Sequence, residues 1–237
     1  VSKMIINEKF LEAPQEVKKR YFQIKYAKYF MAAMRLYMRA KLTISENRKN
    51  KVLSQTLDTY RHELTRANYM ENECVQVLMN IGLYYLIAEK DIQTVKIDAL
   101  THHNRWKRQL SLRIILLTIY EWDMGKASSK NLKELLVRSN VDESLQKELF
   151  GALRLLRKSQ EKAEKLLRDD RNSIIAHRDG DALLQLKMID NLRQDKVMGA
   201  AVDFYDSSKV YMDVFPRVLA QAGSLEGLFA FDLNSSR

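Results

Sequence analysis

Apolar side chains recur along this chain at intervals of three, four and seven residues, the spacing that places them on one face of an α-helix. The most regular stripe comprises Leu145, Leu149, Ala152, Leu156, Ala163, Leu167 and Ile174. Similar patterns predict helices over about 14–38, 51–66, 70–89, 106–124, 129–137, 182–192 and 197–215. No segment shows the strict alternation of a half-buried strand. An all-α fold, a multi-helix bundle, is therefore expected.

Residues that cap or break helices mark the expected boundaries between these segments. They are Ser45-Glu46-Asn47 after the first helix, Gly125 after the fourth, Ser128 or Ser129 before the short helix, Asn140 or Asp142 before the next, and Gly180 before 182–192. Residues 90–104 are polar and give no clear pattern. Pro216 is expected to kink or restart the last helix, because proline lacks the donor that an interior turn requires. Residues 224–237 are expected to form a loosely ordered tail.

Length and composition are consistent with one helical domain over residues 1–237. The chain has only 7 Gly and 2 Pro, so long helices joined by short polar loops are expected. Its longest apolar runs fall short of the ~20 residues that a membrane span needs. No signal-peptide pattern follows the basic residues near the start, and the single Cys74 permits no internal disulfide. These features predict a cytoplasmic protein with no membrane partner.

The net charge of +10 is concentrated in a basic N-terminal helical region, residues 1–66, which contains fifteen Lys or Arg residues and only six Asp or Glu residues. Such a region can attract nucleic acid through its phosphates, or it can be a solvated helix face; both interpretations remain open. Aromatic residues alternate with the cations, at Tyr21, Phe22, Tyr26, Tyr29, Phe30 and Tyr37. Their spacing predicts a buried helical stripe, so they are expected in the core rather than as base-stacking platforms.

Several kinds of chemistry are disfavoured by the motifs. Gly125-Lys126 resembles the end of a phosphate-binding loop, but Ala127 follows where Ser or Thr is needed. His62-Glu63-Leu64-Thr65-Arg66 resembles the start of a zinc-protease helix, but Arg66 stands in place of the second histidine. Neither a cofactor nor a metal is expected.

Two further candidate groups favour structural roles. Asp98 and His102 can share a helix face as metal ligands, yet no third ligand lies near them, and a solvated polar turn is the better interpretation. Cys74 lies beside Val75 and Val77, which is typical of an inert core thiol rather than a nucleophile.

The most informative segment is 171–179, Arg-Asn-Ser-Ile-Ile-Ala-His-Arg-Asp. An arginine binds a phosphate as a planar fork, and an imidazole transfers protons near neutral pH, so Arg171 and His177 form a minimal phosphodiester-cleaving pair. A structural interpretation also stays open, because His177 extends the apolar stripe three residues past Ile174. On one continuous helix the two side chains would lie about 120° and about 9 Å apart. A shared phosphate therefore requires a helix break or a two-fold dimer.

This segment resembles the R-x4-6-H motif of the HEPN superfamily, whose name stands for higher eukaryotes and prokaryotes nucleotide-binding. The string RNSIIAHRD is similar to that of the abortive-infection branch, and the helices around 111–115 and 129–136 fit the same pattern. The HEPN-like portion covers about residues 20–215. The resemblance implies a helical domain that dimerises through its motif-bearing helices, and active members are metal-independent endoribonucleases, often toxins or antiviral effectors.

Transferred residue by residue, the resemblance assigns roles to three side chains, and Arg178 is a further candidate for binding. Arg171 would bind the scissile phosphate, His177 would act as general acid or base, and Asn172 would orient the histidine or the phosphate. Arg178 would bind an RNA phosphate. The attacking group would be the RNA 2′-hydroxyl. Asp179 departs from members that pair with a nucleotidyltransferase antitoxin, which commonly carry a tyrosine at that position.

The expected function is RNA cleavage by a homodimer in a toxin or antiviral abortive-infection setting, with RNA as substrate and an antitoxin or regulatory protein as a further partner. The alternative is a non-enzymatic helical dimer that binds nucleic acid, a nucleotide or a protein. In that case Arg171 and His177 would be structural or would only hold a ligand.

Overall fold

The computed structural model describes residues 14–69, 72–122, 131–168 and 182–235. Over these ranges the chain forms eight helices and no strand, which confirms the all-α prediction. The helices are α2 (Gln15–Tyr69), α3 (Glu73–Thr101), α4 (Arg105–Glu121), α6 (Leu132–Arg138), α7 (Glu143–Arg168), α9 (Ala182–Asn191), α10 (Gln194–Ala222) and α11 (Leu225–Ser235).

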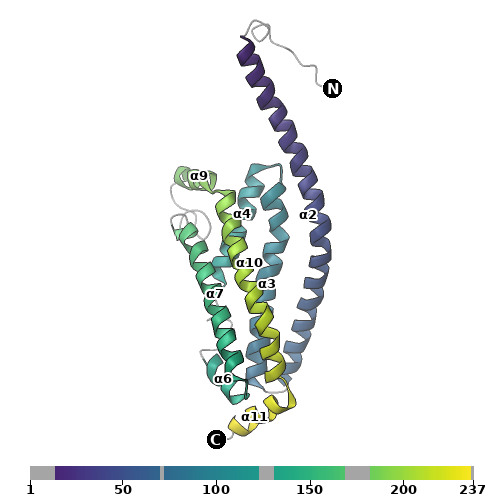
Figure 1. Cartoon of the computed structure of the whole chain (residues 1–237), viewed down its shortest axis with the longest axis vertical. Helices are drawn as coiled ribbons and strands as arrows, with labels where there is room; N and C mark the ends of the chain where they lie inside the picture. Colours follow the sequence, from purple (N-terminus) through teal and green to yellow (C-terminus); the bar gives the residue numbers. More distant parts are fainter. Residues whose placement is uncertain (1–13, 70–71, 123–130, 169–181, 236–237) are drawn as a thin grey trace.

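Helices α3, α4, α7 and α10 run side by side as a bundle, and the second half of α2 lies along α3 (Figure 1). Helix α10 packs mainly on α7, and also on α4 and α3. The largest fully buried side chains include Tyr211, Phe204, Phe215, Leu78, Ile81 and Leu116. Burial of this apolar surface is the main force that holds the helices together.

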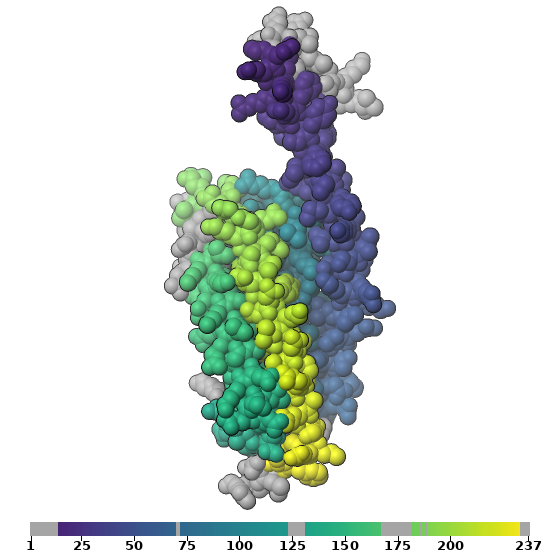
Figure 2. Space-filling view, viewed as in Figure 1, coloured from purple at the N-terminus to yellow at the C-terminus, as the bar shows by residue number. Residues whose placement is uncertain are grey.

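The two ends of the bundle differ. Helices α6 and α11 close one end, while α9 and the turn between α3 and α4 lie at the other (Figure 1). We call the second end the α9 end. Helix α7 ends there, and the first part of α2 projects beyond it (Figures 1 and 2). All the elements that flank the candidate motif therefore meet at this end.

The predicted break at Ser45-Glu46-Asn47 is wrong, because α2 is continuous from Gln15 to Tyr69. The Glu46 carboxylate faces α3, where its Oε2 lies 2.6 Å from Lys96 Nζ, and Lys49 Nζ donates to its Oε1 at 3.3 Å. Burial raises the pKa of Glu46, but the hydrogen bonds and charges of Lys96 and Lys49 outweigh it and leave the pKa lowered. The residue that was expected to end the helix instead attaches it to the bundle.

Residues 90–101, which gave no clear pattern, continue α3 to Thr101. Ile92 and Ala99 are buried there, and the hydroxyl of Thr101 donates to the carbonyl of Ile97 at 2.7 Å. Gln93 is buried as well, and Lys96 and Asp98 pair with Glu46 and Arg39 of α2. A polar sequence therefore concealed the second half of a 29-residue helix.

Helix α10 passes through Pro216 and ends at Ala222, so the expected restart at the proline is wrong, while the expected kink stays a prediction. The expectation of a loose tail is also wrong. Residues 225–235 form helix α11 rather than a loose tail. Phe231 of α11 is only 5% exposed, and the Arg138 guanidinium lies 4.4 Å from its ring centroid. That contact ties α11 to α6.

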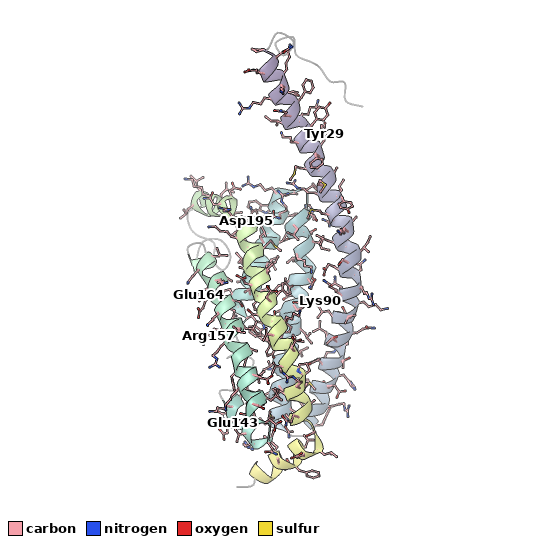
Figure 3. The ribbon with its side chains drawn as sticks, in the orientation of Figure 1. Tyr29, Lys90, Glu143, Arg157, Glu164 and Asp195 are labelled. Atoms are coloured by element: carbon pink, nitrogen blue, oxygen red, sulfur yellow. The ribbon has the colours of Figure 1, made fainter. Side chains whose placement is uncertain are left out.

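The aromatic residues near the start of α2 are not in a core. Tyr26, Tyr29, Phe30 and Tyr37 are 68%, 66%, 65% and 62% exposed, so the predicted burial is wrong. They belong to the first part of α2, which extends past the bundle (Figure 2). Figure 3 labels Tyr29 on this segment. The periodicity identified a common face correctly, but no described helix covers that face.

Candidate functional site

The four residues that the sequence singles out, Arg171, Asn172, His177 and Arg178, lie outside the described residues, in the stretch between α7 and α9. What the structure does describe is the surroundings of that stretch. Helix α7 leads into it at Arg168 and α9 follows it from Ala182, both at the α9 end (Figure 1).

Helix α7 is held firmly as it approaches the α9 end. The side-chain amide of Gln160 donates to the backbone carbonyls of Ile119, at 3.1 Å, and Trp122, which ties α7 to the end of α4. The Lys162 ammonium pairs with the Asp203 carboxylate of α10 at 2.8 Å. Figure 3 shows Glu164, further along α7, at the same end of the bundle as the start of α10.

Helix α9 is attached to the beginning of α4. The Arg105 guanidinium donates to the backbone carbonyl of Asp190 at 3.1 Å and pairs with its carboxylate at 3.1 Å. The side-chain amide of Gln109 donates to the carbonyl of Leu192 at 3.3 Å. The chain therefore enters the candidate stretch from a fixed helix and leaves it into another fixed helix.

Four arginines lie at the turn between α3 and α4 and form what we call the arginine cluster: Arg35 and Arg39 of α2, and Arg105 and Arg108 of α4. Arg108 Nη1 donates to the carbonyl of His102 at 2.6 Å and to that of His103 at 3.1 Å. Burial lowers the pKa of Arg108, and the charges of Arg35 and Arg105 lower it further. Mutual repulsion of this kind favours binding of an anion.

Two carboxylates partly offset the arginine cluster. Arg39 Nη1 lies 2.8 Å from the Asp98 carboxylate, and Arg105 pairs with Asp190. The cluster thus keeps a net positive charge at the turn between α3 and α4. Sequence reasoning placed the excess of cations in residues 1–66 but missed this cluster. Nothing in the chain order shows that α2 passes beside the start of α4.

The Asp98 and His102 pair is not arranged as a metal site. Asp98 pairs with Arg39, and His102 Nδ1 accepts a hydrogen bond from the backbone N–H of Asn104 at 3.0 Å. Within the described ranges no group of three or more His, Cys, Asp or Glu side chains could hold a metal ion. His102 is only 9% exposed, so at this residue the turn is buried and not solvated as expected.

Cys74 fits the inert role that the sequence indicated. Its side chain is fully buried, and burial raises the pKa of its thiol. A thiol that is neutral and closed to solvent cannot attack a substrate, because the thiolate is the nucleophile. The prediction of a core thiol is confirmed.

A second polar cluster lies inside the bundle, between α2, α3 and α10. The side-chain amide of Gln93 donates to Glu89 Oε1 at 2.6 Å and to the Tyr205 hydroxyl at 3.5 Å. Burial raises the pKa of Glu89 in spite of the hydrogen bond from Gln93 and the charge of Lys96, and burial likewise raises that of Tyr205. Lys96 links this cluster to Glu46 on α2. It joins three helices, and its buried position is typical of a structural network.

The surface and the comparisons with known proteins add two findings. None of the described helices combines the length and the apolar character that crossing a membrane requires. No family model, no curated protein and no solved structure matches the chain.

Proposed function

We propose that this chain is a metal-independent endoribonuclease of a toxin or antiviral abortive-infection type, with Arg171 and His177 as its reacting pair. The observation that carries the proposal is the string RNSIIAHRD at 171–179. Support comes from the flanking helices α7 and α9, which are both anchored at the end of the bundle that carries the arginine cluster.

The proposed reaction needs only groups that the chain carries. The His177 imidazole removes the proton from the RNA 2′-hydroxyl, and that oxygen attacks the adjacent phosphorus. The bond from phosphorus to the 5′ oxygen breaks, and this oxygen takes a proton from water or from the second imidazole of a dimer. The products are a 2′,3′-cyclic phosphate and a 5′-hydroxyl. Arg171 neutralises the charge that develops on the phosphate, and Asn172 orients the imidazole or the phosphate.

In this proposal the arginine cluster and Arg178 bind phosphates on either side of the cleaved bond. Arg35 and Arg108 approach each other closely enough for their charges to lower the pKa of Arg108, so a bound phosphate relieves a repulsion that already exists. Each such contact releases counterions from the RNA and makes binding weaker at high salt. The cluster would therefore supply affinity without sequence preference.

A second candidate function is RNA binding without cleavage, and a specific observation favours it. Residues 15–44 of α2 carry eight Lys or Arg residues and a single Glu, a net charge of +7. Such a helix attracts nucleic acid whether or not the chain also cleaves it. The two functions agree on binding and differ only in what Arg171 and His177 do.

Cleavage of mixed-sequence RNA in the presence of a chelator separates the two. The wild type, Arg171→Ala and His177→Ala would be compared with His103→Ala, an exposed histidine in the turn between α3 and α4. The nuclease proposal expects cleavage by the wild type and by His103→Ala only, with equal melting temperatures and equal RNA binding for His177→Ala. A wild type that binds RNA and leaves it intact would support the binding function and reject cleavage.

A further inference from the structure

An exposed apolar stripe runs along one face of α2 from residue 26 to residue 44. Its members recur at steps of three and four residues, which keeps them on the same side of the helix. They are Tyr26, Tyr29, Phe30, Ala33, Leu36, Tyr37, Ala40 and Ile44. The six members other than the two alanines are 62–75% exposed. Water is an unfavourable environment for so much contiguous apolar surface, and a patch of this kind usually marks an interaction site.

The stripe faces away from the bundle. Arg39 pairs with Asp98 of α3 and Glu46 pairs with Lys96 of α3, so the side of α2 that carries Arg39 and Glu46 is turned toward the bundle. Most cations between residues 26 and 44 lie on that side as well, including Arg35, while Lys41 borders the stripe. The stripe itself carries no charge, whereas the cations share the rest of the helix surface with the exposed Met31, Met34 and Met38.

The order of side chains along the stripe is symmetric about Ala33. Counting outward in both directions, Phe30 matches Leu36, Tyr29 matches Tyr37, and Tyr26 matches Ala40. A two-fold axis at Ala33 would therefore set apolar groups of two antiparallel copies opposite each other, with Tyr26 over the small Ala40. This self-matching is the requirement of an isologous interface.

We propose that the stripe is the docking surface for a second copy of this chain, with the two α2 helices antiparallel and crossing at Ala33. This surface differs from the motif-bearing helices through which the HEPN resemblance implies dimerisation. The proposal does not rest on the nuclease function.

The size and shape of the stripe suit this partner. Six large side chains, each about two thirds exposed, present roughly 800 Å² if each offers ~200 Å² in full. A stable interface of standard size buries ~800 Å² on each partner. A shallow, open hollow of about 370 Å³, lined only by Leu36, Arg39, Ala40, Thr43 and Ile44 of α2, includes the small Ala40. Tyr26 of the second copy would lie over it.

Charge distinguishes a second copy from an anionic partner. Residues 15–44 carry a net charge of +7, so two copies repel each other at long range and attract only through the stripe. Salt screens the repulsion and leaves the apolar contact intact, so self-association should strengthen as salt rises. RNA or an anionic membrane would be held by the cationic face, and its binding should weaken as salt rises.

The mass of the full chain in solution, measured by light scattering or sedimentation at low and high salt, tests the proposal. We expect a dimer that strengthens with salt, and a monomer for Ala33→Glu, which would place two carboxylates together at the two-fold axis. The matched control is Ala32→Glu, an exposed neighbour about 100° round the helix on the cationic side, which should remain dimeric. The proposal would be overturned if the wild type were monomeric at every concentration and salt, or if the two variants had equal effects. Assembly seen only with RNA or anionic vesicles would also overturn it.

Cysteine cross-linking tests the orientation. Ala33→Cys should form a disulfide between copies under mild oxidation, while the native Cys74 is fully buried and should not react. Tyr29→Cys should cross-link to Tyr37→Cys when the two variants are mixed, and neither should cross-link to itself. Self cross-linking of Tyr29→Cys would show a parallel pair and would contradict the antiparallel arrangement.

Discussion

Replacement of Gly82 by alanine should destabilise the fold, because three helices meet at this position. A Cβ built at Gly82 of α3 would clash with Cε1 of Tyr60 on α2 and lie 3.1 Å from Cε1 of Phe215 on α10. Alanine favours a helix interior over glycine by ~0.5–1 kcal/mol, whereas an extra buried carbon that forces neighbours to move costs ~1–3 kcal/mol. The clash should dominate, and we expect a net loss of about 1–2 kcal/mol in the free energy of unfolding.

The same substitution at two other helical glycines provides the control. A Cβ at Gly151 of α7 or at Gly199 of α10 would meet nothing within 4 Å. Gly151→Ala and Gly199→Ala should therefore stabilise the protein by ~0.5–1 kcal/mol. Urea unfolding followed by circular dichroism measures all three. The melting temperature should fall by a few degrees for Gly82→Ala and rise slightly for the controls, since ~1 kcal/mol shifts it by ~2–4 °C at this chain length. A Gly82→Ala variant as stable as Gly151→Ala would refute the close packing of α2, α3 and α10.

Three further predictions concern buried and clustered charges. The pKa of Glu89 is raised in the folded protein, so its ionisation costs stability as the pH rises above the usual carboxyl pKa of ~4. Glu89→Gln should therefore raise the melting temperature at pH 7 and lose this advantage in acid. Lys96→Met should lower the free energy of unfolding by about 2–4 kcal/mol, because it leaves the buried Glu46 with only the exposed Lys49 as a partner. Lys49→Met should change the free energy of unfolding by less than ~1 kcal/mol. Equal losses for the two variants would contradict the pairing of Glu46 with Lys96. Arg35→Ala should weaken RNA binding at low salt and reduce the slope of affinity against salt by about 1 in a filter or anisotropy titration.

Helix positions were the most predictable feature, because burial on one side imposes a period that the sequence records directly. The stripe that begins at Leu145 predicted α7, which starts at Glu143, and the pattern at 182–192 predicted α9 almost to the residue. Boundaries failed where long-range contacts override local preference. Glu46 lies inside an unbroken α2 and pairs with Lys96 of α3, fifty residues away in the sequence.

The role of an apolar face was less predictable than its existence. The spacing of Tyr26, Tyr29 and Tyr37 indicates a common helical face equally well whether that face is covered or open. The face is open because the bundle ends at the α3–α4 turn, so that the first part of α2 has no neighbouring helix to cover it. The arginine cluster is a similar case, because Arg35 and Arg108 are brought together by the fold and by nothing in their local sequence. The candidate pair Arg171 and His177 lies outside the described residues, so its roles stay predictions from sequence.

The most direct test of the central proposal is the chemical identity of the ends that the purified protein leaves on RNA in the presence of a chelator. Mass spectrometry should find a 2′,3′-cyclic phosphate on one fragment and a 5′-hydroxyl on the other, with cleavage abolished by His177→Ala and by a 2′-deoxy substitution at the cleaved nucleotide. A 3′-hydroxyl and a 5′-phosphate, or cleavage that requires a metal and survives in His177→Ala, would contradict attack by the 2′-hydroxyl at an Arg171 and His177 site.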